Sequence, residues 1–172
     1  MISRVFLIGF MGSGKSTLGS KLAGRMGYRF VDMDHLIEET AGMTIPGIFR
    51  EHGEKVFRKW EHDVLLELCR QEKIVVSTGG GAPCHGEMID IMNRHGATVY
   101  IRLAPAILRD RLLRSRTERP LIRGKSGREL DEFIEGLLKE REIYYNRATR
   151  VIDGRDPDLD SLVEDLQKWQ RS

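Results

Sequence analysis

The segment Gly9 to Ser16 reads Gly-Phe-Met-Gly-Ser-Gly-Lys-Ser and matches the phosphate-binding pattern G-x-x-x-x-G-K-[ST] in full. Its glycines let the backbone wrap closely around phosphate groups, so that N–H groups point at the oxygens. Lys15 is expected to reach the β- and γ-phosphates of a nucleotide, and the Ser16 hydroxyl to bind Mg²⁺. A glycine-rich turn that binds nothing is the alternative. The predicted nucleotide-binding residues are Gly12, Ser13, Gly14, Lys15, Ser16 and Thr17.

Two carboxylates, Asp32 and Asp34, follow a predicted strand at 29–31. Their spacing places both on one face of an extended chain, at the strand end where parallel sheets bind ligands. One could hold Mg²⁺ through water, and the other could orient an acceptor hydroxyl or take its proton. Capping of the next helix is the alternative, and it is more natural for Asp34 than for Asp32.

Arg58 and Glu61 lie three residues apart on a predicted amphipathic helix, so their side chains can face each other. An arginine held by a glutamate suits a substrate carboxylate, but a surface ion pair has the same spacing. Gly79, Gly80 and Gly81 follow a buried strand, which indicates close approach of a ligand or of another backbone segment.

A basic stretch contains Arg109, Arg111, Arg114, Arg116, Arg119 and Arg123 beside proline and glycine. Such a stretch is usually a solvated surface, and a nucleic-acid contact is another interpretation, although it contains no aromatic stacking platform. Because it follows the fourth strand of a nucleotide-binding fold, we interpret it as a mobile lid over about 112–127. A lid of this kind excludes water and supplies an arginine to the transferred phosphoryl group.

Alternating strands and helices must position these residues. Strands are expected at 5–8, 29–31, 74–77, 98–103 and 151–152. Leu18, Leu22 and Met26 mark a first helix that Gly27 ends. Further helices are expected at 34–41, 45–52, 54–70, 87–94, 107–113, 129–145 and 159–169; Phe57, Trp60, Val64 and Leu68 mark the buried side of the third of these. The alternation predicts an α/β fold of three layers, with about five parallel strands and helices on both faces.

Composition narrows the class of protein. The 172 residues, 40% of them apolar, fit one domain over 1–172, and a net charge of +2 does not suggest a nucleic-acid binder. Cys69 and Cys84 form no disulfide framework or zinc pattern. The apolar start is too short for a signal peptide or a membrane span, so we expect no membrane association and a cytoplasmic protein. The Asn-Lys-x-Asp element of GTPases is absent.

The ordered set of motifs resembles shikimate kinase, a P-loop kinase with a nucleoside-monophosphate-kinase-like fold. The set comprises the Gly9 to Thr17 loop, Asp32-Met33-Asp34, Gly53-Glu54 with Phe57-Arg58 and Glu61, Gly79-Gly80-Gly81 and Arg119-Pro120-Leu121. The resemblance implies phosphorylation of the shikimate 3-hydroxyl by ATP with Mg²⁺, on the route to chorismate and aromatic amino acids. It also implies a monomer and an acceptor-binding region over about 33–61.

The resemblance further implies a role for individual residues. Shikimate would be held by Asp34, Arg58, Gly79, Gly80, Gly81 and Arg141. Asp34 would take or orient the proton of the reacting hydroxyl, and Arg58 and Arg141 would pair with the carboxylate. Ser16 and Asp32 would serve Mg²⁺, and Arg119 would act on the phosphoryl group. An arginine among Arg111, Arg114 and Arg116 would contact adenine, with Arg155 in the loop on the adenine side; a plain strand-to-helix turn explains Arg155 equally well.

Two rivals share the phosphate loop. A kinase of gluconate or of a nucleoside monophosphate would use the same Gly9 to Thr17 segment, and only the full set of motifs favours shikimate. A nucleotide-dependent switch or a catalytically silent module is the rival from another class. Such a module has no need for Asp34, Arg58 and a lid arginine together.

Overall fold

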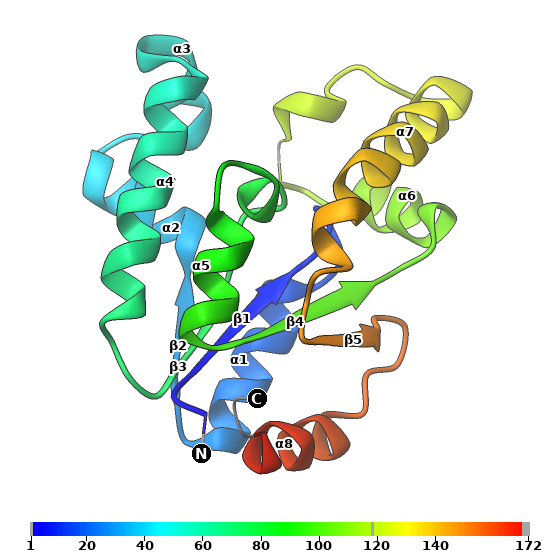
Figure 1. The fold of residues 1–172 in the computed structure, drawn as a ribbon. Helices are drawn as coiled ribbons and strands as arrows, with labels where there is room; N and C mark the ends of the chain where they lie inside the picture. The colour runs from blue at the N-terminus through cyan, green and yellow to red at the C-terminus, as the bar shows by residue number, and fades with distance from the viewer. Residues whose placement is uncertain (1, 118, 170–172) are drawn as a thin grey trace.

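A parallel β-sheet forms the centre of the computed structural model (Figure 1). Residues 2–117 and 119–169, which the structure describes, contain five strands: β1 (Arg4–Ile8), β2 (Arg29–Asp32), β3 (Ile74–Ser77), β4 (Ala97–Arg102) and β5 (Arg150–Asp153). Their order across the sheet is β2-β3-β1-β4-β5, and every pairing is parallel. The loops that follow β2, β3 and β1 therefore emerge side by side at one edge of the sheet. This order brings Asp32, Gly79 and the Gly9 loop together.

Helices cover both faces of the sheet, as the sequence predicts. They are α1 (Lys15–Met26), α2 (Met33–Ala41), α3 (Ile45–His52), α4 (Glu54–Cys69), α5 (Met88–His95), α6 (Pro105–Arg114), α7 (Gly127–Tyr145) and α8 (Leu159–Lys168), with short 3₁₀ turns η1 (Ala82–Cys84) and η2 (Pro120–Ile122). Figure 1 shows α1 and α8 on one side of the sheet and α4, α5 and α7 on the other. The three-layer α/β prediction is confirmed.

Two apolar cores hold the layers together. Phe6 and Ile8 of β1 point into the core beneath α4, α5 and α7, whereas Val5 and Leu7 point into the core beneath α1 and α8. All four side chains are fully buried. Burial on both faces explains why β1 is an unbroken apolar run rather than an alternating one.

The helix that was expected at 54–70 buries only part of the predicted stripe: Phe57 and Leu68 are buried as expected. Leu65 and Glu61 of α4 are buried, whereas Trp60 and Val64 are half-buried. The reason is that α4 packs against α2, α3 and α5, so its buried surface is broader than one apolar stripe. The burial of a glutamate on this helix bears directly on the site.

Among the described helices, none is both long and apolar enough to cross a membrane.

Candidate active site

The loop between β1 and α1 has the geometry of an anion site. Gly12 and Gly14 have φ values of 78° and 95°, which side chains rarely adopt, and a Cβ at Gly12 would lie 3.0 Å from Leu112 Cδ2. Helix α1 begins directly after Gly14, which offers no side-chain cap. The first N–H groups of α1 and the positive end of its dipole are therefore open to a phosphate.

Lys15 lies folded into this loop. Its ammonium donates hydrogen bonds to the carbonyl oxygens of Gly9, at 2.8 Å, and Phe10, at 3.0 Å, and the residue is only 8% exposed. Burial lowers the pKa of Lys15 to about 8; Asp34 opposes the shift, and Arg119 adds to it. A bound phosphate would supply the negative charge that this cation lacks in its present surroundings.

Oxygen atoms suitable for Mg²⁺ meet beside the loop. Ser16 Oγ donates to Asp32 Oδ2 at 2.7 Å and lies 3.3 Å from Ser77 Oγ. Carboxylate and hydroxyl oxygens are the ligands that Mg²⁺ prefers, so these residues fit the ion. Asp32 Oδ1 also accepts the N–H of His35, which makes Asp32 the cap of α2. The expectation that Asp34 is the more natural cap is wrong, because α2 already begins at Met33.

The three glycines after β3 are each crowded by a charged side chain. A Cβ at Gly79 would lie 2.8 Å from Asp34 Oδ1, and one at Gly81 would lie 3.0 Å from an Arg58 nitrogen. At Gly80 the nearest atom would be Arg141 Nη1, at 3.2 Å. The predicted close approach therefore exists, and it gathers one carboxylate and two guanidinium groups from three different helices at one turn.

Arg58 is held by two glutamates. Its Nη1 lies 2.8 Å from Glu61 Oε1, and its Nε lies 3.5 Å from Glu54 Oε1. Glu61 is only 1% exposed, so the alternative of a surface ion pair is wrong. Burial raises the pKa of Glu61, and the adjacent Arg58 opposes that rise. The Arg58 guanidinium also lies over the Phe57 ring, 5.0 Å from its centroid, which stiffens it further.

Asp34 and Arg119 complete the polar surroundings. Burial raises the pKa of Asp34, as does Asp32, whereas Lys15 lowers it. Burial lowers the pKa of Arg119, and Asp34 opposes that change. Lys15, Asp34 and Arg119 therefore act on one another, although they come from α1, α2 and the segment before η2. A carboxyl with a raised pKa beside two cations can accept a proton from a hydroxyl and return it.

Several buried side-chain donors in this region have no hydrogen-bond partner. Within the described residues, the side-chain atoms that are buried without a hydrogen bond are Ser13 Oγ, Arg58 Nε, Arg119 Nε and Arg141 Nη1. All four belong to residues that the sequence assigns to nucleotide or acceptor. Since a buried donor without a partner costs about 1–3 kcal/mol, their clustering indicates a site that anionic ligands complete.

Arg111 is the basic residue that reaches the phosphate loop from α6. Its two terminal nitrogens donate to the carbonyl oxygens of Ser13 and Gly154, both at 3.2 Å. Arg114 and Arg116, the other two candidates for the adenine contact, are exposed. Arg111 therefore links the loop after β1 to the turn after β5, at the side of the site away from Asp34.

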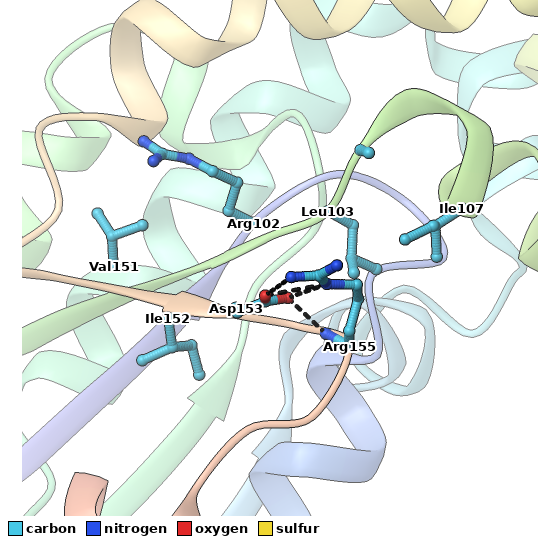
Figure 2. A pocket seen from close by; sticks show the side chains of 8 residues that line it. Arg102, Leu103, Ile107, Val151, Ile152, Asp153 and Arg155 are labelled. Atoms are coloured by element: carbon cyan, nitrogen blue, oxygen red, sulfur yellow. Dashed lines mark hydrogen bonds and ion pairs between the residues drawn. The ribbon is translucent and has the colours of Figure 1, made fainter.

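A cavity of about 610 Å³ lies beside this link, at the ends of β4 and β5 (Figure 2). Its lining residues are Arg102, Leu103, Ala104, Ile107, Val151, Ile152, Asp153 and Arg155. Arg155 is folded over Asp153 and donates to both of its carboxylate oxygens, and this holds the pKa of Asp153 at about 2. Arg155, which was expected on the adenine side, thus lines this cavity and is paired with Asp153.

Comparison with known proteins identifies the family. The family model described as shikimate kinase matches residues 11–170. The shikimate kinase of Parabacteroides distasonis is 39% identical over 165 residues, which are 96% of this chain and 95% of the relative. The chain belongs to the shikimate kinase family.

Solved shikimate kinases share the whole fold. The crystal structure of shikimate kinase from Bacteroides thetaiotaomicron is 38% identical, with a TM-score of 0.89 and coverage of 98% of both chains. The Acinetobacter baumannii shikimate kinase, solved in complex with shikimate, is 32% identical, with a TM-score of 0.84 and coverage of 98% of this chain and 92% of that one. The resemblance and the P-loop kinase fold are both confirmed, and the chain is a kinase of this family.

Three side chains at the site escaped the sequence analysis. Ser77 is the last residue of β3 and lies against Ser16. The Phe49 ring packs at a tilt against the Phe57 ring, with 4.7 Å between centroids, and is 37% exposed, so it extends the apolar surface beside Arg58. The Tyr145 hydroxyl donates to the Gly80 carbonyl. The exposed aromatic in an amphipathic helix was a usable signal for Phe49, whereas nothing local marks Ser77.

Proposed function

We propose that this enzyme transfers the γ-phosphoryl group of ATP to the 3-hydroxyl of shikimate, with Mg²⁺ as the metal. The observation that carries the proposal is the convergence of Asp34, Arg58 and Arg141 on Gly79 to Gly81, next to the loop that holds Lys15. An acceptor in this space meets two cations at one end and a carboxylate at the other. The shikimate-bound relative from Acinetobacter baumannii supports the choice of acceptor.

The phosphate side is assigned to the first loop and to α1. The N–H groups of Gly12, Ser13 and Gly14 would surround the β-phosphate, as would those of Lys15, Ser16 and Thr17. Lys15 would turn from the carbonyls of Gly9 and Phe10 toward the γ-phosphate. Ser16 Oγ and Asp32 would hold Mg²⁺, Asp32 through water; the ion, when bound, neutralises charge on the phosphates.

The acceptor side follows from the charges around the glycine turn. Arg58, fixed by Glu61, and Arg141 would pair with the carboxylate of shikimate. The 3-oxygen attacks the γ-phosphorus, the bond from that phosphorus to the β-γ bridging oxygen breaks, and ADP leaves. Asp34 accepts the proton of the 3-hydroxyl. Arg119 would neutralise the charge that spreads over the transferred phosphoryl group.

The remaining assignments concern the nucleoside end and the moving parts. Arg111 would contact adenine, because it already lies between the phosphate loop and Gly154. Arg155 would face the same side once it parts from Asp153. We further propose one domain over 1–172, with an acceptor-binding region over 33–61 and a lid over 112–127 that closes when both substrates are bound. The enzyme is proposed to act as a cytoplasmic monomer in the formation of chorismate.

A coupled ADP-release assay with Mg²⁺ and ATP tests the reaction. Shikimate, gluconate, AMP and no acceptor are compared at matched concentrations, and ADP that forms only with shikimate supports the proposal. Activity with gluconate or AMP would leave the phosphate site intact and remove the acceptor assignment. ADP release that ignores the acceptor would favour a nucleotide switch.

Two variants divide the assignment. Lys15→Ala should abolish turnover, whereas Arg58→Ala should raise the KM for shikimate and leave the KM for ATP near its original value. The exposed Lys59→Ala, one residue from Arg58, is the matched control because its side chain points into solvent. Near-normal turnover of Lys15→Ala would contradict the phosphate role.

A further inference from the structure

Tyr145 is a buried tyrosine at the end of α7 whose hydroxyl reaches the acceptor turn. The residue is fully buried, and its hydroxyl donates a hydrogen bond to the carbonyl oxygen of Gly80. Its ring packs against Tyr100, with 5.0 Å between centroids, and the Tyr100 hydroxyl donates to Glu142 Oε1 at 3.1 Å. The Tyr145 ring thus packs against β4 while its hydroxyl reaches the turn before η1, and it cannot shift without disturbing both contacts.

Arg141 lies one helical turn before Tyr145, so both side chains project from the same stripe of α7. A Cβ at Gly80 would lie 3.2 Å from Arg141 Nη1, and one at Gly81 would lie 3.3 Å from Nη2. Burial raises the pKa of the Tyr145 phenol, and the Arg141 guanidinium opposes that rise, which places the two groups close together. Tyr145 therefore contacts the turn that Arg141 overhangs.

The two arginines of the acceptor site are held in different ways. Glu61 and Glu54 fix Arg58. Arg141, in contrast, has no ion pair with any carboxylate of residues 2–117 or 119–169, and its buried Nη1 has no hydrogen-bond partner among them. Its guanidinium lies over the Phe10 ring, 5.7 Å from the centroid. Arg141 thus depends on the placement of α7 itself.

We propose that Tyr145 is a positioning residue for the acceptor site. Its hydrogen bond to the Gly80 carbonyl ties α7 to the glycine turn, and so sets where the Arg141 guanidinium lies relative to that turn and to the acceptor carboxylate with which it is proposed to pair. Tyr145 acts through Arg141 and Gly80 and touches no reacting atom. The inference rests on the proposed pairing of Arg141 with the shikimate carboxylate.

The test removes one hydroxyl at a time. Tyr145→Phe should raise the KM for shikimate about tenfold, since the Gly80 carbonyl then loses its buried donor and α7 loses its tie to the turn. The kcat and the KM for ATP should stay within about twofold, because Arg119 and the phosphate loop are untouched. A mere loss of stability would lower the melting temperature without separating the two KM values.

Two tyrosines serve as matched controls. Tyr100→Phe removes the hydroxyl of the neighbouring buried ring, whose hydrogen bond goes to Glu142 rather than to the turn. Tyr144→Phe removes a hydroxyl that forms no hydrogen bond with the described residues. Both variants should keep the KM for shikimate. An equal rise in Tyr100→Phe and Tyr145→Phe would overturn the inference, because core stability would then explain it.

A double-mutant cycle with Arg141→Ala separates this inference from the proposed function. If Tyr145 acts through Arg141, Tyr145→Phe should have little further effect on the KM for shikimate in the Arg141→Ala background. The same tenfold effect in both backgrounds would overturn the inference and leave Arg141 its role. An unchanged KM in Arg141→Ala alone would remove the carboxylate pairing as well.

Discussion

Replacing Asp32 by asparagine should separate the two roles that this side chain combines. Asp32 Oδ2 accepts from Ser16 at the proposed Mg²⁺ site, and Asp32 Oδ1 accepts the N–H of His35 as the cap of α2. Asparagine caps helices about as well as aspartate, but it carries no charge for the metal. Its single carbonyl oxygen can keep the bond to His35 and present the amide to Ser16.

The magnitudes follow from these two contacts. Loss of a group that supports a metal site typically lowers metal affinity about 10–100-fold, so Asp32→Asn should raise the half-saturating Mg²⁺ concentration by that factor. Its melting temperature should stay within about 1 °C. Asp32→Ala also loses the cap, which costs about 1 kcal/mol, or about 2–4 °C in a chain of this size.

Two measurements decide the matter. ADP release is followed as Mg²⁺ is titrated at fixed ATP and shikimate, and thermal unfolding is recorded without ligands. An unchanged Mg²⁺ requirement in Asp32→Asn would refute the metal role. Equal losses of melting temperature in Asp32→Asn and Asp32→Ala would refute the capping role. Asp158→Asn makes the same change at the cap of α8, away from the proposed metal site, so it shows what the replacement does at a cap without a metal role.

Three further predictions concern the charged groups and the glycine turn. The pKa of Lys15 is lowered to about 8, so its cationic form is lost as the pH rises through that value. The KM for ATP should therefore rise between pH 8 and pH 9.5. A KM for ATP that stays constant over this range would contradict the prediction. Because the pKa of Asp34 is raised, kcat/KM for shikimate should begin to fall with acid at a pH above the ordinary aspartate pKa. An acid limb at that ordinary pKa would exclude Asp34 as the titrating base. Asp34→Asn should lower kcat by about 10²–10⁴-fold. In Gly79→Ala the new Cβ would meet Asp34 Oδ1 at 2.8 Å, so the KM for shikimate should rise at least about tenfold, since a displacement of even 1 Å in a site is costly. Gly136→Ala on the exposed face of α7 is its control: nothing lies within 4 Å, activity should be unchanged, and the melting temperature should rise by about 2–4 °C.

The fold was readable from the sequence because its central strands, such as β1 and β3, are buried on both faces. Segments such as Val5 to Ile8 and Ile74 to Val76 are apolar throughout, and glycines such as Gly27 end helices in the left-handed conformation. The carboxylates were harder to assign, because Asp32 and Asp34 share a face only along an extended chain, whereas the strand stops at Asp32 and α2 begins at Met33. The cap of α2 is therefore Asp32 and not Asp34.

The acceptor groups depended on information that local spacing does not contain. Arg141 lies in the last turns of a helix rich in charged residues, and only the tertiary fold places it over Gly80. The same holds for Arg111, which local sequence does not distinguish from Arg114 or Arg116 until α6 is seen against the phosphate loop. Long-range contacts across the strand order β2-β3-β1-β4 create the site, so motif spacing alone predicts its parts but not their arrangement.

The charges of the ligand-free site explain why it should respond to both substrates together. Burial lowers the pKa of Lys15 and raises the pKa of Asp34, so both groups are pushed toward their neutral forms. With a pKa of about 8, Lys15 is already cationic in the acid range where Asp34 titrates, so the change that bound ATP makes there is the negative charge of its phosphates, which raises the pKa of Asp34 further. Arg119 lies within the influence of both groups. We therefore expect the acid limb of kcat/KM for shikimate to move to higher pH when ATP is saturating. An acid limb that does not depend on ATP would show that the phosphates do not act on Asp34.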